Sequence, residues 1–171
     1  MSYILTDDEI RGLLKVTPPL VTGMPNADEQ IQPNGIDLTV KEIASLSSSG
    51  SIGFENKHRV LSSKSPLVFD DSGAIDLPAG SYLVAYNEVV HLPKNIMAIG
   101  FPRSSLLRCG VSVHTAVWDA GYSGRSESLL VVYNINGFRL HSNARIAQLV
   151  FFQLGQVVNQ GYDGIFQGEN I

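Results

Sequence analysis

Short runs of apolar and β-branched residues, separated by turn residues, recur along most of the chain. In the first run, residues 35–40, apolar and polar positions alternate as they do in a half-buried strand. Similar runs follow at residues 65–69, 81–87, 96–101, 111–117, 129–134 and 146–154. This pattern predicts a mainly β fold, either a sandwich or a barrel.

The start of the chain has a different pattern, which predicts one short amphipathic helix. Thr6 and Glu9 have the spacing of a capping box, in which each side chain bonds to the other residue's backbone N–H. Apolar residues follow at helical intervals: Ile10, Leu13 and Leu14. Pro18 and Pro19 then end the helix, because proline lacks the N–H that a helix interior needs.

Several segments between the strands have the composition of turns or loops. Residues 47–53 are serine and glycine apart from Ile52, which predicts a mobile loop. Residues 77–80 and 91–95 are rich in turn formers. Residues 134–137 end in the Asn-Gly pair that tight hairpins favour, so a hairpin is expected there.

The length of 171 residues predicts a single domain, residues 1–171, that can bury a sizeable core. Its tail, residues 161–171, combines glycines with aromatic side chains, so we expect a flexible segment that can close over a ligand. Charged residues make up only 16% of the chain and apolar residues 44%. Copies of the chain are therefore expected to cover part of its surface, which predicts a homo-oligomer.

Net charge indicates which partners the protein can attract, and cysteine content indicates the cellular compartment in which it works. The net charge of -4 gives no field that would attract nucleic acid, so non-specific nucleic-acid binding is not expected. Cys109 is the only cysteine, which excludes an internal disulfide and fits a reducing cytoplasm. The N-terminal segment has neither a basic region nor a long apolar stretch, and no apolar run in the chain reaches about 18 residues. We therefore expect neither export nor a membrane span, and a cytoplasmic location.

One segment has the residues that a phosphate chain requires of a protein. Two arginines enclose two adjacent serines: Arg103, Ser104, Ser105 and Arg108. Guanidinium groups present planar pairs of donors to phosphate oxygens, and serines add hydroxyl and amide donors. The alternative is a strand end whose arginines face water or pair with carboxylates.

Two further polar residues are candidates for a site. Asp119 lies in a Gly-rich segment where a strand is expected to turn back, and a carboxylate there can orient or deprotonate water near a phosphorus atom. The alternative is a turn aspartate that caps its own backbone. Gln148 is polar in an otherwise apolar strand, which fits a ligand hydrogen bond or an interface or bulge position.

The four histidines lie far apart, without the spacing of metal ligands: His58, His91, His114 and His141. We therefore expect no metal site built by protein side chains. Mg²⁺ would arrive with a triphosphate, because it prefers phosphate oxygens and water to an all-protein cage.

Taken in order, four segments resemble the dUTPase and dCTP deaminase superfamily. They are Gly-Ile-Asp-Leu at 35–38, Pro-Arg-Ser-Ser-Leu at 102–106, Asp-Ala-Gly-Tyr-Ser-Gly at 119–124 and Ala-Arg-Ile-Ala-Gln-Leu at 144–149. The Gly-rich aromatic tail follows them, so the resemblance spans nearly the whole chain. It implies a distorted β-barrel or jelly roll that forms a homotrimer with active sites between subunits.

The resemblance also implies roles for individual residues. The triphosphate would be held by Arg103, Ser104, Ser105 and Gln148. Asp119 would orient the water that attacks the α-phosphorus, and Tyr122 would pack against the deoxyribose and exclude a 2′-hydroxyl. The tail would bring Tyr162 or Phe166 near the base or sugar and Gln167 near the phosphates.

The superfamily contains enzymes that hydrolyse dUTP, enzymes that deaminate dCTP and enzymes that do both. Deamination by this fold uses a glutamate as a proton shuttle. Counted from Gly124, its position is Leu129; counted back from Asn134, it is Val131. The carboxylate nearby belongs to Glu127, which neither count puts in place, although a bulge would be one way to turn it inward.

We therefore predict a Mg²⁺-dependent dUTP diphosphatase that forms dUMP and diphosphate, similar to archaeal-type dUTPases with a deaminase-like body. The N-terminal helix and Arg108 resemble the deaminase branch, so a dCTP deaminase or a bifunctional enzyme is the alternative. A non-catalytic nucleotide-binding trimer is the second alternative. Backbone groups around His114 and Thr115 would read uracil or cytosine equally well.

Overall fold

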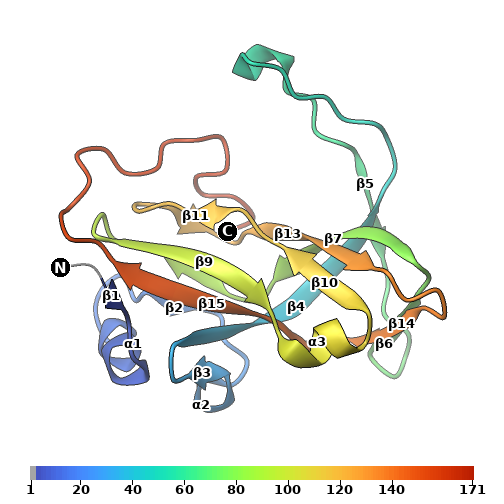
Figure 1. Ribbon diagram of the computed structural model, residues 1–171, viewed down its shortest axis with the longest axis horizontal. Coiled ribbons are helices and arrows are strands. Elements are labelled where there is room, and N and C mark those ends of the chain that lie inside the picture. The colour runs from blue at the N-terminus through green and yellow to red at the C-terminus, as the bar shows by residue number, and fades with distance from the viewer. Residues whose placement is uncertain (1–2) are drawn as a thin grey trace.

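The computed structural model describes residues 3–171 and is dominated by one curled antiparallel sheet (Figure 1). Its main path runs β10 (Val111–His114), β13 (Glu127–Val132), β7 (Gly80–Tyr86), β4 (Gly35–Leu46), β15 (Arg145–Gln153), β9 (Ile96–Pro102) and β11 (Val117–Trp118). Three short strands extend this sheet at its sides: β1 (Tyr3–Ile4) on β15, and β3 (Ile31–Gln32) and β5 (Lys64–Leu67) on β4. The predicted mainly β fold is confirmed.

Two smaller sheets complete the described part of the chain. One contains β12 (Ser123–Gly124), β8 (Val89–His91) and β2 (Val21–Thr22). The other pairs β14 (Phe138–His141) with β6 (Ala74–Leu77). The helical segments are α1 (Asp7–Leu13), α2 (Ala27–Gln30), η1 (Asn56–His58) and α3 (Ser104–Arg108). Within residues 3–171, no helix combines the length and apolar character needed to cross a membrane.

Alternation along the strands builds the core. In β13, Ser128, Leu130 and Val132 are buried while the residues between them stay partly exposed. Fully buried side chains from the other central strands pack with them: Ile36, Leu38, Ile43, Tyr86, Ile96, Ile146 and Phe151. Removing apolar side chains from water is the main favourable contribution to folding, so this shared interior holds the curled sheet together.

The predicted N-terminal helix is present as α1, with the predicted capping box. The Thr6 hydroxyl accepts from the Glu9 N–H at 3.4 Å, and the Glu9 carboxylate accepts from the Thr6 N–H at 2.9 Å. Ile10 is fully buried and anchors the helix to the sheet. The helix ends at Leu13, well before the two prolines expected to stop it.

A buried polar network that the sequence pattern did not reveal fixes α2 against β4. Gln30 donates to the Asp37 carbonyl at 2.8 Å and to the Glu88 carboxylate at 2.6 Å. Glu88 also accepts from the Thr39 N–H at 2.9 Å and from its hydroxyl at 2.6 Å. Gln30 and Glu88 are each only 1% exposed, so these bonds satisfy groups that water cannot reach.

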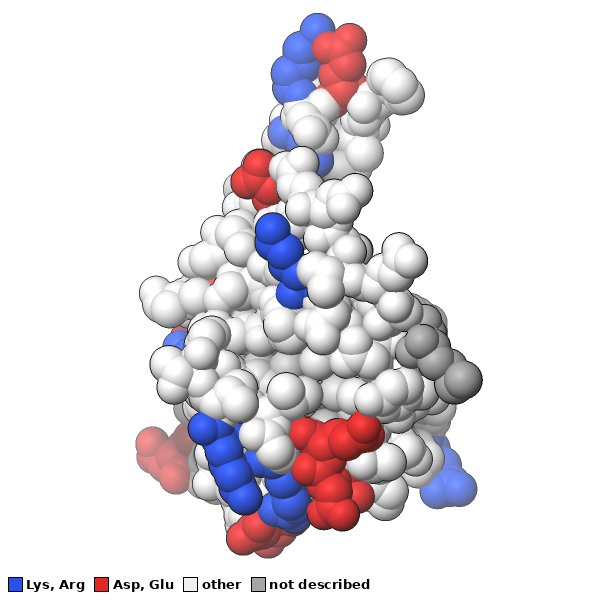
Figure 2. Space-filling model, turned by 90° about the vertical axis from the view of Figure 1, so that its left-hand side faces the viewer, with Lys and Arg blue, Asp and Glu red and all other residues white. Residues whose placement is uncertain are grey.

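The predicted loop at residues 47–53 is present, with one isolated bridge at Ser51, and it is one leg of a paired projection. Its mobility stays a prediction. We call residues 47–63 the arm. Ser47 donates to Ser63 at 2.8 Å, and Ser51 and Val60 exchange two backbone hydrogen bonds of 2.8 Å. The arm rises from the body with η1 near its far end, where Figure 2 shows charged side chains. Serine-rich composition concealed this pairing, since backbone bonds need no apolar side chain.

Two local predictions are corrected. Residues 134–137 do form a turn, with Gly137 donating to the Asn134 carbonyl at 2.9 Å. The flanking strands, β13 and β14, lie in different sheets, so the turn does not close a hairpin. The predicted strand at 111–117 is divided into β10 and β11 by a break at Thr115 and Ala116.

Candidate active site

The predicted anion-binding residues gather where β9 ends and α3 begins. Arg103 precedes α3, and Ser104 and Ser105 are its first, exposed residues. As the first helical residues, both serines have N–H groups without an intrahelical partner. Strand register sets Gln148 of β15 opposite Phe101 of β9, on the same sheet region. We call Arg103, Ser104, Ser105 and Gln148 the anion site; Arg108 is exposed at the other end of α3.

A buried carboxylate, Asp37 on β4, lies directly behind the anion site. Register pairs it with Gln148, and its Oδ2 atom is 3.0 Å from Arg103 Nε and 3.6 Å from an Arg145 guanidinium nitrogen. The side chain is 2% exposed. Both contacts are ion pairs by distance, without the alignment of a hydrogen bond. Burial raises the pKa of Asp37, and the positive charges of Arg103 and Arg145 oppose that rise.

Asp37 restricts where the Arg103 guanidinium can lie. Its Nε faces Asp37, and one terminal nitrogen donates to the Arg145 carbonyl at 3.2 Å. The Arg103 side chain is 30% exposed, so part of the planar group faces solvent beside the serines. The arrangement therefore fixes an arginine at an exposed edge with its remaining donors available to an anion.

Asp119 lies on a tight turn after β11. The Tyr122 N–H donates to the Asp119 carbonyl at 3.0 Å, and the Asp119 side chain is exposed. Gly121 within this turn has a φ of +90°, and a Cβ atom there would come within 2.7 Å of the Gly161 Cα. Only glycine meets both requirements, so the turn and the tail can approach backbone to backbone.

The tail packs on this same turn. Tyr162 donates its N–H to the Ala120 carbonyl at 2.8 Å, and its ring meets the Tyr122 ring edge-on at 5.7 Å between centroids. Gln167 donates to the Gly121 carbonyl and accepts from the Ser123 N–H, each at 3.0 Å. Both amide atoms of Gln167 are thus bonded to the turn. The family resemblance placed Gln167 near the phosphates, whereas in this structure it lies on the Asp119 turn.

Tyr122 forms one wall of a cavity of about 770 Å³. We call this space the Tyr122 cavity. Its residues come from the turn region, the base of the arm and the tail: Ala116, Val117, Trp118, Tyr122, Ser126, Glu127, Leu46, Leu61, Ser62, Ser63, Lys64, Leu83, Tyr162, Phe166 and Glu169. Aromatic and aliphatic walls with a few polar groups are typical of a small-molecule site.

Three charged side chains face this cavity. Lys64, at the base of the arm, forms an ion pair with Glu127, the first residue of β13. Glu169 of the tail accepts from the Tyr122 hydroxyl at 2.8 Å. Burial raises the pKa of Glu169, the Tyr122 hydrogen bond lowers it, and the charges of Glu127 and Lys64 act in opposite directions.

The two positions that a deaminase glutamate would occupy, Leu129 and Val131, share a strand face with Glu127. All three are the partly exposed members of the alternating β13 pattern. Glu127 alone of the three lines the cavity, and β13 keeps a regular register with β7 and β10, so no bulge is needed to turn Glu127 inward. Counting positions from Gly124 or Asn134 did not reveal this, because neither count uses the alternation of the strand.

Other predicted residues lie outside the cavity. His114 is exposed, and its Nε2 is 3.0 Å from the Tyr133 hydroxyl. Thr115 donates its hydroxyl to the Gly100 carbonyl at 3.0 Å. Their neighbour Ala116 does line the cavity, so backbone groups of this segment lie beside it.

Within one chain, the anion site and Asp119 are far apart. Trp118 pairs with Ala98 near the start of β9, whereas Arg103 follows the end of β9 (Figure 1). Five residue steps separate Ala98 from Arg103, which is ~17 Å along a strand. A base acts at hydrogen-bond distance from its reacting atom, so these two groups of one chain do not serve the same phosphorus.

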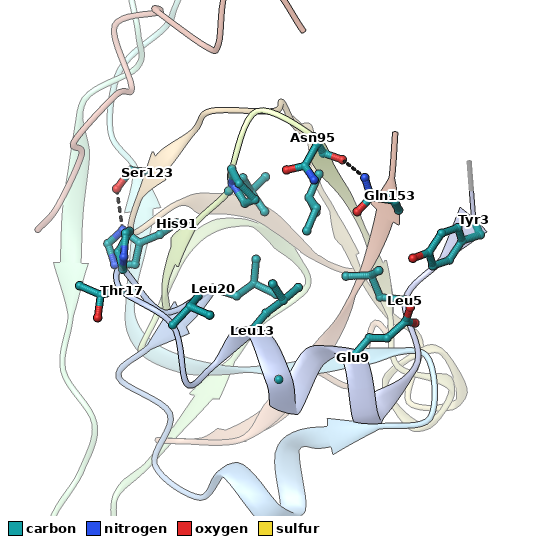
Figure 3. Close-up of a pocket in the computed structure, with 16 residues that line it drawn as sticks. Tyr3, Leu5, Glu9, Leu13, Thr17, Leu20, His91, Asn95, Ser123 and Gln153 are labelled. Carbon is teal, nitrogen blue, oxygen red and sulfur yellow. Dashed lines mark hydrogen bonds between the residues drawn. The ribbon is translucent and has the colours of Figure 1, made fainter. Parts of the chain in front are cut away.

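A second cavity, of about 690 Å³, lies between α1 and the segment that follows β8 (Figure 3). Its floor is apolar, with Leu5, Leu13 and Leu20, and His91 Nδ1 lies 2.7 Å from the Ser123 hydroxyl at one side. Burial lowers the pKa of His91. None of the described residues that line this cavity is a predicted site residue.

Comparison with known proteins gives consistent matches. A family model described as dCTP deaminase-like matches residues 4–154. A protein of Methanosarcina mazei, named probable deoxyuridine 5′-triphosphate nucleotidohydrolase, is 50% identical over 167 residues, 98% of each chain. An Archaeoglobus fulgidus protein of the same name is 46% identical over 168 residues, again 98% of each chain.

Among solved structures, the fold resembles a 2′-deoxycytidine 5′-triphosphate deaminase from Agrobacterium tumefaciens. The TM-score is 0.66 at 21% identity, over 89% of this chain and 48% of that one. At this identity the likeness concerns the fold alone. The family match, which covers most of the chain, and the full-length archaeal relatives show that this chain belongs to the dCTP deaminase-like family.

Proposed function

We propose that this chain is a dUTP diphosphatase, which hydrolyses dUTP to dUMP and diphosphate. The observation that carries the proposal is the Asp119 turn: an exposed carboxylate three residues before Tyr122, which walls a cavity large enough for a nucleoside. The archaeal relatives that match over 98% of the chain are named as nucleotidohydrolases of deoxyuridine triphosphate, which supports uracil as the base.

In the proposed reaction, Asp119 orients a water and accepts its proton as the oxygen attacks the α-phosphorus. The bond between the α-phosphorus and the oxygen that bridges to the β-phosphorus breaks, and diphosphate leaves. Arg103, Ser104, Ser105 and Gln148 hold the triphosphate oxygens, with Arg108 as a further contact. Fixed positive charge at these oxygens stabilises the transition state because it requires no reorganisation during the reaction.

The nucleoside part of dUTP would occupy the Tyr122 cavity. The deoxyribose packs on Tyr122, and the tail covers the bound nucleotide with Tyr162 and Phe166. Gln167 then exchanges its turn contacts for the phosphates. Support comes from Tyr162 and Phe166, which already line this cavity beside Tyr122.

We propose Mg²⁺ as the cofactor. Bound to the triphosphate, Mg²⁺ neutralises charge on the phosphate oxygens. Residues 3–171 hold no group of three or more His, Cys, Asp or Glu side chains suited to a metal. The ligands in this proposal are therefore phosphate oxygens and water, which suit its octahedral preference. The role of the protein is to fix Arg103 and the serines where the remaining charge lies.

The separation along β9 favours a site completed by two copies of the chain. In this arrangement, the anion site of one copy meets the Asp119 turn of another. The family resemblance implies a homotrimer. In a homotrimer, each copy supplies its anion site to one active site and its Asp119 turn to another. We further propose a cytoplasmic location, because the single Cys109 side chain is exposed and would require a reducing environment to stay free.

The alternative of dCTP deamination has one observation in its favour, since Glu127 lines the Tyr122 cavity. Its ion pair with Lys64 argues against that role. A proton shuttle must reach the cytosine ring and the leaving ammonia, whereas the Glu127 carboxylate is already held by the Lys64 ammonium group.

Product analysis tests the proposal directly. Purified protein is incubated with Mg²⁺ and either dUTP or dCTP, and products are separated by ion-exchange chromatography. We expect dUMP and diphosphate from dUTP and no change in dCTP. Formation of dUTP or dUMP from dCTP would instead establish a deaminase.

The Asp119→Asn variant separates catalysis from binding. The amide keeps the size of the side chain but does not accept a proton, so turnover of dUTP should fall by at least about a thousandfold. Calorimetric binding of a non-hydrolysable α,β-imido dUTP should change little. Full turnover by this variant would contradict the assigned role, and binding without turnover by the wild type would favour a nucleotide-binding protein.

A further inference from the structure

We propose that the Lys64–Glu127 ion pair reads the base edge of the substrate and selects uracil over cytosine. This inference rests on the proposed function, because it assigns the Tyr122 cavity to the nucleoside. Neither residue belongs to the motifs that carry the family resemblance. The pair unites the base of the arm with the start of β13, at positions far apart in the sequence.

The pair is accessible from the cavity. The Lys64 side chain is 46% exposed and that of Glu127 is 24% exposed, and both line the space that Trp118 and Tyr122 wall with aromatic rings. An ammonium group has three donors and a carboxylate has about four acceptor sites. Each can therefore keep its partner and still bond to a base.

Their chemistry presents one donor beside one acceptor. Uracil offers the complementary order, with O4 as an acceptor beside N3–H as a donor. Cytosine reverses both groups, with a donating amino group at position 4 and an accepting N3. A donor and an acceptor held in fixed order can therefore bond to both N3 and the group at position 4 of one base. With the other base, the same order places donor against donor and acceptor against acceptor.

The proposed order of the pair decides which base is matched. Glu127 begins β13 five residues after Tyr122, and we assign it to N3, the ring atom nearer the sugar that packs on Tyr122. Lys64 begins β5 beside the arm, and we assign it to position 4. In this order the carboxylate accepts from uracil N3–H and the ammonium donates to O4. Cytosine would place its accepting N3 against the carboxylate and its donating amino group against the ammonium. Neither pair can form a hydrogen bond, which disfavours cytosine in a desolvated site.

The remaining charge in the cavity is consistent with this assignment. Glu169 is bonded to the Tyr122 hydroxyl, and Lys64 is the one cation among the described residues that line the cavity. Loss of Lys64 would leave two carboxylates without a counter-charge beside a neutral base. We therefore expect Lys64 to matter for binding as well as for selection.

The test compares dUTP and dCTP analogues on matched variants. Calorimetry with α,β-imido dUTP and α,β-imido dCTP gives the affinity ratio, and steady-state kinetics with dUTP and dCTP gives the ratio of kcat/KM. The variants are Glu127→Gln and Lys64→Ala, with Lys57→Ala as the control. Lys57 forms a similar ion pair with Glu55 near the end of the arm.

Both site variants should lower the dUTP-to-dCTP ratio by at least about tenfold, because an amide presents either a donor or an acceptor and alanine presents neither. The control should keep the wild-type ratio. A double exchange, Lys64→Glu with Glu127→Lys, preserves an ion pair and reverses the order. It should raise the relative affinity for the cytosine analogue.

Unchanged ratios in all variants that keep wild-type thermal unfolding would overturn the inference, as would a wild type that binds both analogues equally. Failure of the proposed function has a different signature, namely no dUMP from dUTP in the wild type. In that case the two analogues still test base reading by affinity alone.

Discussion

Asp37 is a buried carboxylate that contacts an arginine of the proposed anion site. It is buried, it is held on β4, and its carboxylate faces the guanidinium groups of Arg103 and Arg145. The Gly-Ile-Asp-Leu segment marks this position in the sequence. The ion pair itself was not predictable, because Arg103 follows a different strand that only the sheet topology brings alongside.

Replacing Asp37 by asparagine should leave the Arg103 guanidinium less firmly positioned for binding the triphosphate. The amide retains the shape and removes the charge that fixes Nε, so we expect kcat/KM for dUTP to fall about tenfold, which is ~1.4 kcal/mol. Steady-state kinetics provides the measurement. The control is Asp76→Asn, which breaks an exposed ion pair with Arg139. Equal effects of the two variants would show that Asp37 does not position Arg103.

Glu88 should make stability depend on pH. Burial raises its pKa in the folded protein, with bonds from Thr39 and Gln30 acting against the rise. A raised folded-state pKa gives a stability contribution that is complete below the ordinary glutamate pKa and is lost as pH rises through the raised value. The free energy of unfolding of the wild type, relative to Glu88→Gln, should therefore decrease as pH rises from about 4.5 to 8.

Urea unfolding of both proteins at equal concentration measures this difference. Subtracting the variant removes the other titrating groups that the two proteins share. A difference that grows with pH would contradict a raised pKa for Glu88.

Strands with strong apolar alternation could be predicted from the sequence, whereas short polar elements could not. Residues 81–87, 96–101 and 146–154 become β7, β9 and most of β15. The pair β6 and β14 was missed because Asp76, Arg139 and His141 interrupt its apolar pattern. The five residues of α3 are too few to display helical periodicity. The local sequence pattern thus predicted the central strands and missed α3, the helix that contains Ser104 and Ser105 of the anion site.

The docked tail should be sensitive to pH through Glu169. Burial raises its pKa when the tail is docked, so docking binds protons. The contribution of this side chain to docking is complete below the ordinary pKa of glutamate and declines as pH rises through the raised value. Hydrogen exchange of residues 161–170 should accordingly increase with pH, beyond the intrinsic increase, between about pH 4.5 and 7.

The matched control for this prediction is Glu169→Gln, which keeps a hydrogen bond to Tyr122 and does not titrate. Its tail should show only the intrinsic pH dependence of exchange. Identical profiles for wild type and variant would show that Glu169 does not control docking.

The molecule as a whole divides the proposed chemistry between two ends of β9. Motif order along the sequence was sufficient to predict the family and the mainly β fold, both of which are now shown. It gave no distances, so the ~17 Å between the Asp119 end and the Arg103 end became visible only in the folded chain. The same holds for the pairing of Lys64 with Glu127. The separation of Asp119 from Arg103 makes assembly of two or more copies of the chain a requirement of the proposed mechanism.

The most direct test mixes two inactive variants. Arg103→Ala lacks the arginine of the anion site and Asp119→Asn lacks the base, so each variant alone should have very low dUTP hydrolysis. After dissociation and reassembly in equal amounts, sites shared between copies combine an intact Arg103 with an intact Asp119 in about a quarter of cases. Recovery of about a quarter of wild-type dUMP formation is the predicted result. A mixture no more active than the two variants measured separately would contradict a site shared between copies.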